Sequence, residues 1–493
     1  MTRQRDTTSA WQPRYHVAAA RNFLNDPVGL LQHNGIYHLF FQANPAAPVW
    51  GRPQWEHVTS PDLATWRREP TALTPEETGP DCDGCWSGCT RVVDGTPMIY
   101  YTGIVGEGDQ RVESVCRAFG SKDLVTWTKD PANPLIPGPP DGLGTGYHRD
   151  PWLWQDEHGW HLLLGSGTLG DHPQGMVLIY DSADATTWTY GGLFFTAPQD
   201  RPDDLGDHWE CPQLVRCGDQ WVLIFSIQKP NAERPLSHVV YFIGNVTEGR
   251  FNGRYGGRVD YGNVMYAPAV MVDQQGRNLL WGWAQEWLPL ARQQELAIVG
   301  AVTLPRELHL VEGALRSTPV PELQGLRREP PLTGWPTVGE AQELHLGADT
   351  GRVLVGTDAG AQWELEVIIG GASGRLRLGT ALTEPADTAL ELVLDLDRRV
   401  LSATVGGMPA GWSGTVDLPD AATLPVIRIY RDGSLLEILC AGLTITTRWY
   451  APTNAALLAE TIDGDAEVAD CRVWSMIDEA VTGPTEARNA STT

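Results

Sequence analysis

The chain has 493 residues, a formal net charge of −25 and a sequence pI near 4.8. Nucleic acids and anionic membranes would repel so acidic a chain, and we predict neither as a partner. A neutral ligand is easier to accommodate, and the 20 tryptophans offer ring faces that can stack on sugars, although most of them are expected in the core.

Residues 1–21 form the first predicted segment. They carry early arginines but no apolar run of the length that a signal peptide needs, and nothing elsewhere in the chain approaches a membrane span. We therefore expect a cytoplasmic protein.

A repeat is the clearest sign of the fold in the segment that follows. The pattern Ser-x-Asp-x-x-Thr-Trp begins at Ser60, Ser121 and Ser182, at a constant interval of 61 residues. That interval accommodates four short strands and their turns, which is one blade of a β-propeller. We interpret the repeated pattern itself as a structural turn away from the central axis.

Five blade openings follow one another between residues 22 and 316. In each of them a short polar cluster precedes an apolar strand. The five clusters are Asn25-Asp26-Pro27, Trp86-Ser87-Gly88, Arg149-Asp150-Pro151, Glu210-Cys211-Pro212 and Tyr266-Ala267-Pro268. The sequence therefore predicts a five-bladed propeller over residues 22–316.

Three of these openings carry a carboxylate in an equivalent position: Asp26, Asp150 and Glu210. The inner strand of every blade faces the axis, so we expect the three to meet in one axial pocket. Converging acids around a neutral ligand suit glycoside hydrolysis, in which one carboxylate attacks the anomeric carbon and another protonates the leaving oxygen. Arg149 should favour the ionised form of Asp150, whereas Glu210, next to Trp209, should hold its proton and act as the acid.

Each of these acidic residues taken alone would be interpreted as part of a turn, because Asp side chains bond readily to nearby backbone. Catalysis is favoured only because all three residues are acidic and occupy equivalent positions in their blades.

The second half of the chain has a different character. Residues 317–340 are rich in proline and are predicted to form a linker. Alternating strands, such as those over 363–369 and 389–395, then predict a β-sandwich over residues 341–476, followed by a polar tail over 477–493. We interpret the sandwich either as support for the propeller edge or as a surface for a homo-oligomer.

The eight cysteines do not form a dense disulfide pattern, and we expect free thiols. Cys82, Cys85 and Cys89 raise the alternative of a zinc site, but no nearby fourth Cys or spaced His completes a tetrahedron. We predict no metal and no cofactor.

The first four clusters, in their order along the chain, resemble the four signature blocks of glycoside hydrolase family 32, and the fifth cluster, at Tyr266, also fits the resemblance. The resemblance extends to Gln42-Ala43-Asn44-Pro45, Trp50-Gly51, Asp260-Tyr261-Gly262 and the segment 303–308, and in the second domain to the segment from Asp432 to Glu437. It spans nearly the whole chain, and the combination of motifs is highly specific.

The resemblance implies a five-bladed propeller with a C-terminal sandwich that cleaves β-fructofuranosides with retention. It implies that Asp26 is the nucleophile, Asp150 the transition-state stabiliser and Glu210 the acid/base. The residues that fall where the family binds the fructosyl unit are Asn25, Gln42, Trp50, Trp86, Ser87, Arg149 and Trp283. For Gln42, a solvated strand residue is the alternative interpretation.

Two departures from the family pattern put substrate preference in doubt. The family usually has Asn in place of Val28, and Asp-Phe in place of Val264-Met265. We expect both positions to lie near the sugar, where a lost hydrogen-bonding side chain would weaken binding by about 1 to 3 kcal/mol.

The leading hypothesis is a hydrolase of sucrose or short fructo-oligosaccharides. A fructosyltransferase would use the same covalent step but pass the fructosyl group to a sugar, and sequence separates the two poorly. A sugar-binding propeller without activity is disfavoured because all three carboxylates are present. A related inverting hydrolase would hold its carboxyl groups about 6.5 to 9.5 Å apart, whereas we predict about 5 Å between Asp26 and Glu210.

Overall fold

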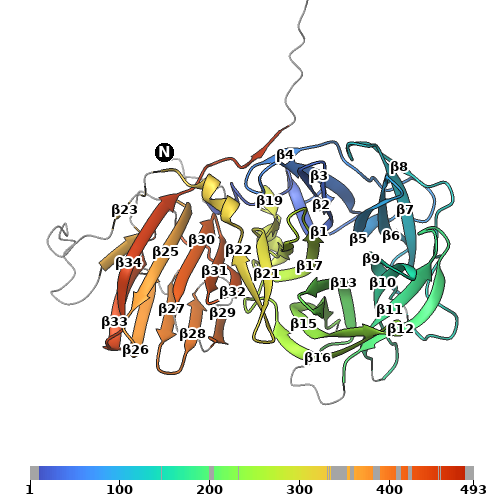
Figure 1. Ribbon diagram of the computed structural model, residues 1–493. Coiled ribbons are helices and arrows are strands. Elements are labelled where there is room, and N and C mark those ends of the chain that lie inside the picture. The colour runs from blue at the N-terminus through green and yellow to red at the C-terminus, as the bar shows by residue number, and fades with distance from the viewer. Residues whose placement is uncertain are drawn as a thin grey trace, which may run out of the picture.

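The computed structural model describes most of the chain, and the following account refers to these residues. They are 10–145, 147–171, 173–198, 205–230, 232–329, 331, 333–334, 352–355, 360–380, 389–406, 412–419, 425–452, 455 and 457–483. Within them the structure is almost entirely β (Figure 1).

Five sheets, each with an antiparallel set of four or five strands, follow one another along the first two thirds of the chain. The first two blades contain β1 (Asn22–His33), β2 (Ile36–Asn44), β3 (Gln54–Ser60) and β4 (Trp66–Arg68), then β5 (Gly84–Val93), β6 (Thr96–Val105), β7 (Val112–Gly120) and β8 (Trp127–Lys129). The third and fourth contain β9 (Arg149–Asp156), β10 (Gly159–Gly167), β11 (Gly175–Ser182) and β12 (Thr189–Thr196), then β13 (His208–Cys217), β14 (Gln220–Gln228), β15 (Leu236–Thr247) and β16 (Arg250–Arg258). The fifth contains β17 (Met265–Val272), β18 (Asn278–Ala284), β20 (Ala301–Val302), β21 (Arg306–Val311) and β22 (Ala314–Pro319).

The first strands of the five sheets form a closed ring. β1 contacts β5, β5 contacts β9, β9 contacts β13, β13 contacts β17, and β17 returns to β1. The ring is closed further by β19 (Ile298–Val299), which comes from the chain after the fifth inner strand and pairs in parallel with β1. The five-bladed propeller predicted from the sequence is therefore confirmed (Figure 1).

The repeated Ser-x-Asp-x-x-Thr-Trp pattern forms the turn between the third and fourth strands of a blade, as predicted. In the first copy, Asp62 Oδ1 accepts hydrogen bonds from the backbone N–H of Ala64 (3.0 Å) and of Thr65 (2.8 Å). In the third copy, Asp184 Oδ1 accepts the equivalent pair from Thr186 and Thr187, both at 2.8 Å. A short polar side chain that satisfies turn N–H groups explains why the pattern recurs at this turn in the first three blades.

Two six-stranded sheets form the second domain. One contains β23 (Thr333–Gly334), β34 (Glu467–Ser475), β25 (Gln362–Gly370), β30 (Val426–Asp432), β31 (Leu435–Cys440) and β32 (Leu443–Arg448). The other contains β24 (Arg352–Val355), β33 (Leu457–Gly464), β26 (Gly374–Thr380), β27 (Leu390–Asp395), β28 (Val400–Val405) and β29 (Trp412–Asp417). Alternate side chains such as Trp363, Leu365 and Val367 are buried in a common core with Leu392 and Leu394, which confirms the predicted sandwich.

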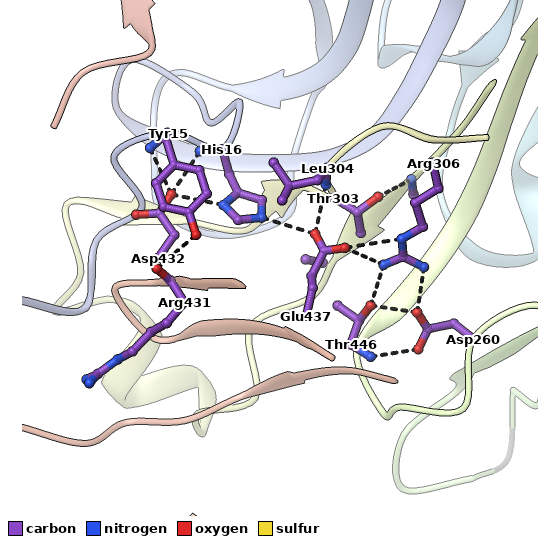
Figure 2. A network of polar contacts seen from close by, with 12 residues as sticks. Tyr15, His16, Asp260, Thr303, Leu304, Arg306, Arg431, Asp432, Glu437 and Thr446 are labelled. Carbon is purple, nitrogen blue, oxygen red and sulfur yellow. Dashed lines mark hydrogen bonds and ion pairs between the residues drawn. The ribbon is translucent and has the colours of Figure 1, made fainter. Parts of the chain in front are cut away.

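The two domains are joined by a buried network of polar side chains, shown in Figure 2. We call it the interface network: His16, Asp260, Arg306, Asp432, Glu437 and Thr446. The sandwich residue Glu437 accepts hydrogen bonds from Arg306 of the propeller, from the Leu304 N–H and from the ring of His16. The motif from Asp432 to Glu437 therefore connects the sandwich to the propeller.

The predicted domain boundaries can be compared with the strands. The boundary at residue 316 falls inside β22, and the linker 317–340 contains the 3₁₀ helix η3 (Pro321–Leu326) and β23. The tail 477–493 begins with ordered chain, because β35 (Val481–Thr482) pairs in parallel with β4 of the first blade. In the segment 1–21, the backbone N–H groups of Arg14, Tyr15 and His16 all donate to Asp432. Residues 1–9, 335–340, 341–351 and 484–493 lie outside the described residues.

Helices are short throughout the described chain: beside η3 there are η2 (Gly108–Gln110) and α1 (Leu290–Gln293). None of these described helices is long and apolar enough to span a membrane.

Candidate active site

The inner strand of every blade is irregular at the same point. The pairing register shifts at Leu24/Pro27 in β1, at Trp86/Gly88 in β5, opposite Leu163/Gly165 in β9, at Glu210/Gln213 in β13 and at Tyr266/Ala269 in β17. A β-bulge inserts one extra residue and turns a side chain away from the regular alternation. Proline tolerates such a position because it lacks the N–H that a regular ladder would use.

All ten residues singled out in the sequence line one cavity of 370 Å³ at the propeller axis, seven of them from the bulged inner strands and Gln42, Trp50 and Trp283 from neighbouring strands and loops. They are Asn25, Asp26, Gln42, Trp50, Trp86, Ser87, Arg149, Asp150, Glu210 and Trp283. The three carboxylates come from blades one, three and four.

Asp26 is held by a chain of hydrogen bonds. Ser87 Oγ donates to Asp26 Oδ2 at 2.5 Å, and Asn25 Nδ2 donates to Asp26 Oδ1 at 3.0 Å. Gln42 fixes both donors, because its Nε2 donates to Ser87 Oγ and its Oε1 accepts from Asn25 Nδ2, each at 2.7 Å. Gln42 is 2% exposed, so it is a buried part of this network and not a solvated strand residue.

Asp26 carries a charge that burial disfavours. Burial raises the pKa of Asp26 to about 6, and the charge of Glu210 acts in the same direction. The hydrogen bonds from Ser87, Cys211 and Asn25 oppose this rise by stabilising the ionised form. The side chain is therefore a carboxylate at neutral pH that is fixed in orientation.

Asp150 lies near the start of β9, at the bulge, with a positive φ of 62°. Its Oδ2 accepts the backbone N–H of Cys211 at 2.8 Å. Burial raises the pKa of Asp150; Arg149 lowers it, as the sequence predicts, but the charges of Glu210 and Asp26 add to the effect of burial. The net effect raises the pKa of Asp150 well above the usual value of an aspartate.

Glu210 has different neighbours from those expected. Arg149 Nη2 lies 2.9 Å from Glu210 Oε1, and Tyr266 Oη donates to Glu210 Oε2 at 2.5 Å. Trp209 directly precedes Glu210 in β13. Its side chain is buried in the propeller core against Phe225, with ring centroids 4.2 Å apart. Successive side chains of a strand point to opposite faces, and sequence proximity to Trp209 was therefore a poor guide to the surroundings of Glu210.

Aromatic rings line the mouth of the cavity. Trp50 is 47% exposed and meets Trp86 edge to face, with ring centroids 5.4 Å apart. Trp283 is buried and packs edge to face on Phe23 at 5.9 Å. Two buried polar atoms on the wall, Asn25 Oδ1 and Trp283 Nε1, find no hydrogen-bond partner within the described part of the chain.

Eight further residues line the cavity that the sequence did not assign to the site. They are Phe23, Arg111, Tyr147, Gln228, Pro230, Pro235, Leu236 and Tyr266. Tyr266 could have been found, because its cluster opens the fifth blade in phase with the three carboxylates. Arg111 and Pro230 lie on loops between the second and third strands of their blades, and these loops do not share the repeat pattern.

The expectation that Val28 and Val264-Met265 lie at the sugar site was wrong. None of the three lines the cavity. Val28 is 2% exposed in a core cluster with Phe40 and Trp55, and Val264 is fully buried in another cluster with Ala284. Apolar side chains suit these positions because Val28 and Met265 pack within the propeller and Val264 also packs against Leu435 of the sandwich.

A metal site has no support among the residues that the structure describes, where no group of three or more His, Cys, Asp or Glu is placed to hold an ion. Cys82, Cys85 and Cys89 are free thiols, as expected, and so are the other five cysteines.

Comparison with known proteins places this site in a family. Residues 16–319 match the model described as "Glycosyl hydrolases family 32 N-terminal domain". The raffinose invertase of Escherichia coli is 29% identical, over 95% of this chain and 96% of its own. The sucrose-6-phosphate hydrolase of Escherichia coli is 33% identical, over 65% of this chain and 67% of its own.

Solved structures support the same family assignment. The sucrose-6-phosphate hydrolase from Lactobacillus gasseri superposes with a TM-score of 0.79 at 26% identity, over 96% of this chain and 94% of its own. The family model covers the whole propeller, and the structural match covers both domains. The chain belongs to glycoside hydrolase family 32 and is a glycoside hydrolase of the β-fructofuranosidase type.

Proposed function

We propose that this enzyme hydrolyses terminal β-D-fructofuranosides such as sucrose and short fructo-oligosaccharides, with retention, through a covalent fructosyl-enzyme. The observation that carries the proposal is the position of Asp26, Asp150 and Glu210 on one cavity, with Asp26 fixed by a network that leaves it ionised at neutral pH.

In the first step, a carboxylate oxygen of Asp26 attacks the anomeric carbon C2 of the fructosyl unit. The bond from C2 to the glycosidic oxygen breaks, and Glu210 transfers its proton to that oxygen so that the leaving sugar departs as a neutral alcohol. Tyr266 Oη and Arg149 Nη2 hold the two oxygens of Glu210 and so orient the proton donor.

In the second step, Glu210 accepts a proton from water, whose oxygen attacks C2 and releases Asp26 as a carboxylate. Asp150 bonds fructosyl hydroxyls and stabilises the positive charge that develops on the ring in both transition states. Asn25 Oδ1 and Trp283 Nε1, which have no hydrogen-bond partner among the described residues, offer one acceptor and one donor for further hydroxyls of the same sugar.

The size and charge of the cavity favour a short neutral substrate. Its 370 Å³ lies near the lower end of the range of about 300–1,000 Å³ for small-molecule sites. Two guanidinium groups, those of Arg111 and Arg149, face three carboxylates, and both also pair with Glu113. Because both arginines are already engaged by Glu113, neither offers a free positive charge to a phosphate dianion, and we expect sucrose to be preferred over sucrose 6-phosphate.

The test is product analysis of the purified enzyme with sucrose, 1-kestose, inulin, levan and sucrose 6-phosphate. We expect free fructose, first released as the β-furanose anomer in ¹H NMR spectra, with sucrose and 1-kestose turned over fastest. Longer fructosides as the main product would make the enzyme a transferase. Initial release of the α-anomer would show inversion and would overturn the retaining mechanism. It would also contradict the separation of about 5 Å between Asp26 and Glu210 that a retaining enzyme requires.

A further inference from the structure

Glu113 lies behind the cavity and does not line it. It belongs to β7 of the second blade, and 2% of the residue is exposed. Its Oε1 pairs with Arg149 Nη1 at 2.5 Å and with Arg111 Nε at 2.9 Å, and its Oε2 accepts the backbone N–H of His148 at 2.7 Å. One buried carboxylate thus holds two guanidinium groups of the cavity wall and the backbone N–H of His148, which lies between the wall residues Tyr147 and Arg149.

Arg149 is shared between two carboxylates. While Nη1 bonds to Glu113, Nη2 lies on Glu210 Oε1 at 2.9 Å and donates to Gln228 Oε1 at 3.3 Å. The guanidinium is planar, so a contact that fixes one of its nitrogens also fixes the direction of the other. Glu113 therefore determines how Arg149 meets Glu210.

The same carboxylate acts on two further parts of the site. It holds Arg111 over the ring of Trp86, with the guanidinium carbon 5.1 Å from the ring centroid. Through the His148 N–H it also fixes the backbone just before Asp150, whose positive φ of 62° is an unusual conformation for a residue with a side chain.

We propose that Glu113 is a positioning residue for the acid/base step: it orients Arg149 against Glu210 and keeps that arginine from neutralising Glu210 completely. This inference rests on the proposed function, because it assigns Glu113 to the proton transfer by Glu210. Glu113 touches no substrate, since the cavity wall separates it from the sugar site.

The charge of Glu113 has a direct physical consequence. Without it, Arg149 would pair with Glu210 alone and stabilise its ionised form, which cannot protonate a leaving group. The carboxylates of Asp26 and Asp150 also face Arg149 and Glu210, as does the hydroxyl of Tyr266. Neither nearby histidine carries charge at neutral pH, because burial lowers the pKa of both His148 and His208 to about 4.

The experiment compares the wild type with Glu113→Gln and Glu113→Asp. For Glu113→Gln we expect kcat on sucrose to fall about 100-fold with KM nearly unchanged, because the acid is misoriented but the sugar contacts remain. We expect the alkaline limb of the pH–rate profile to move about one pH unit lower. Glu113→Asp keeps the charge, so it should restore the wild-type position of that limb and part of kcat.

Glu157→Gln is the matched control, since the Glu157 side chain is 87% exposed in the third blade and should leave rate and profile unchanged. An unchanged kcat in Glu113→Gln, or a lower kcat with the alkaline limb in place, would overturn the positioning role. If the wild type turned over no fructoside, the proposed function would fail by itself. The crystal structure of Glu113→Gln would then decide the inference, which requires Arg149 to leave its wild-type orientation on Glu210.

Discussion

Two clusters of buried carboxylates in this protein have opposite electrostatic character. In the interface network, Asp260, Asp432 and Glu437 are matched by Arg306, by His16 and by several backbone N–H groups (Figure 2). Burial raises the pKa of Glu437, but Arg306 and His16 outweigh it and bring the pKa down to about 2.

In the active site the balance is reversed. Arg149 pairs with Glu210 and lowers the pKa of Asp150, but Glu113 competes for the same guanidinium. The charge of Asp26 is stabilised by hydrogen bonds from the neutral groups of Ser87, Cys211 and Asn25. Burial therefore raises the pKa of Asp26 to about 6, and it raises the pKa of Asp150 as well. The difference teaches that a buried acid is structural where its charge is fully paired, and is available for proton transfer and nucleophilic attack where the charge is left partly unpaired.

The largest expected effect separates activity from stability at Asp26. We expect Asp26→Asn to lose about 10⁴-fold or more in kcat on sucrose, about 5.5 kcal/mol of transition-state stabilisation, because the nucleophile is removed. The melting temperature should stay the same or rise, since burial disfavours the carboxylate of Asp26. Fructose release and differential scanning calorimetry measure the two quantities. Activity within tenfold of wild type would exclude Asp26 as nucleophile.

The opposite result is expected in the interface network. Glu437→Gln should lower the free energy of unfolding by about 3–5 kcal/mol, because Arg306 and His16 stay buried without their counter-charge. Urea unfolding followed by tryptophan fluorescence measures this, and kcat per folded molecule should be unaffected. In the same domain, the side chain of Glu460 is 46% exposed, and Glu460→Gln should change the free energy of unfolding by less than about 0.5 kcal/mol. Equal effects of the two variants would contradict the comparison.

The smallest effect is a pH dependence that separates the clusters. Since Asp26 has a pKa of about 6 and must be ionised to attack, kcat/KM on sucrose should fall about tenfold per pH unit below that value. Glu437 has a lowered pKa, so its contribution to stability is present above its unfolded value and is lost only as pH falls toward 2. Activity lost at pH 5 should therefore return at pH 7. An acid limb near pH 4 would indicate that Asp26 is not desolvated.

The arrangement of the blades could be predicted from the sequence because it repeats. The interval of 61 residues and the five polar clusters depend on local turn and strand chemistry, and residues in the same phase of a repeat must share a place in the fold. The ten proposed site residues were found in this way and through the family resemblance, and the structure brings all of them to one cavity. Tyr266 had the same phase but no charge to draw attention to it.

The surroundings of each residue could not be predicted in the same way. Val28 was placed near the sugar because the family usually has a hydrogen-bonding Asn at this position, but the bulge in β1 turns it toward Phe40 and Trp55 in the core. Glu113 lies far from the motif that contains Arg149, and its contact with that residue depends on two blades packing side by side.

The sequence by itself determined which groups can react and that they must converge, because covalent order and a constant repeat fix the residue types and their phase. Only the tertiary structure decided how each charge is compensated. Whether a buried acid meets an arginine, a backbone N–H or another acid depends on contacts between blades and between domains, and these contacts set the pKa of Asp26 and of Glu437 on opposite sides of the usual value.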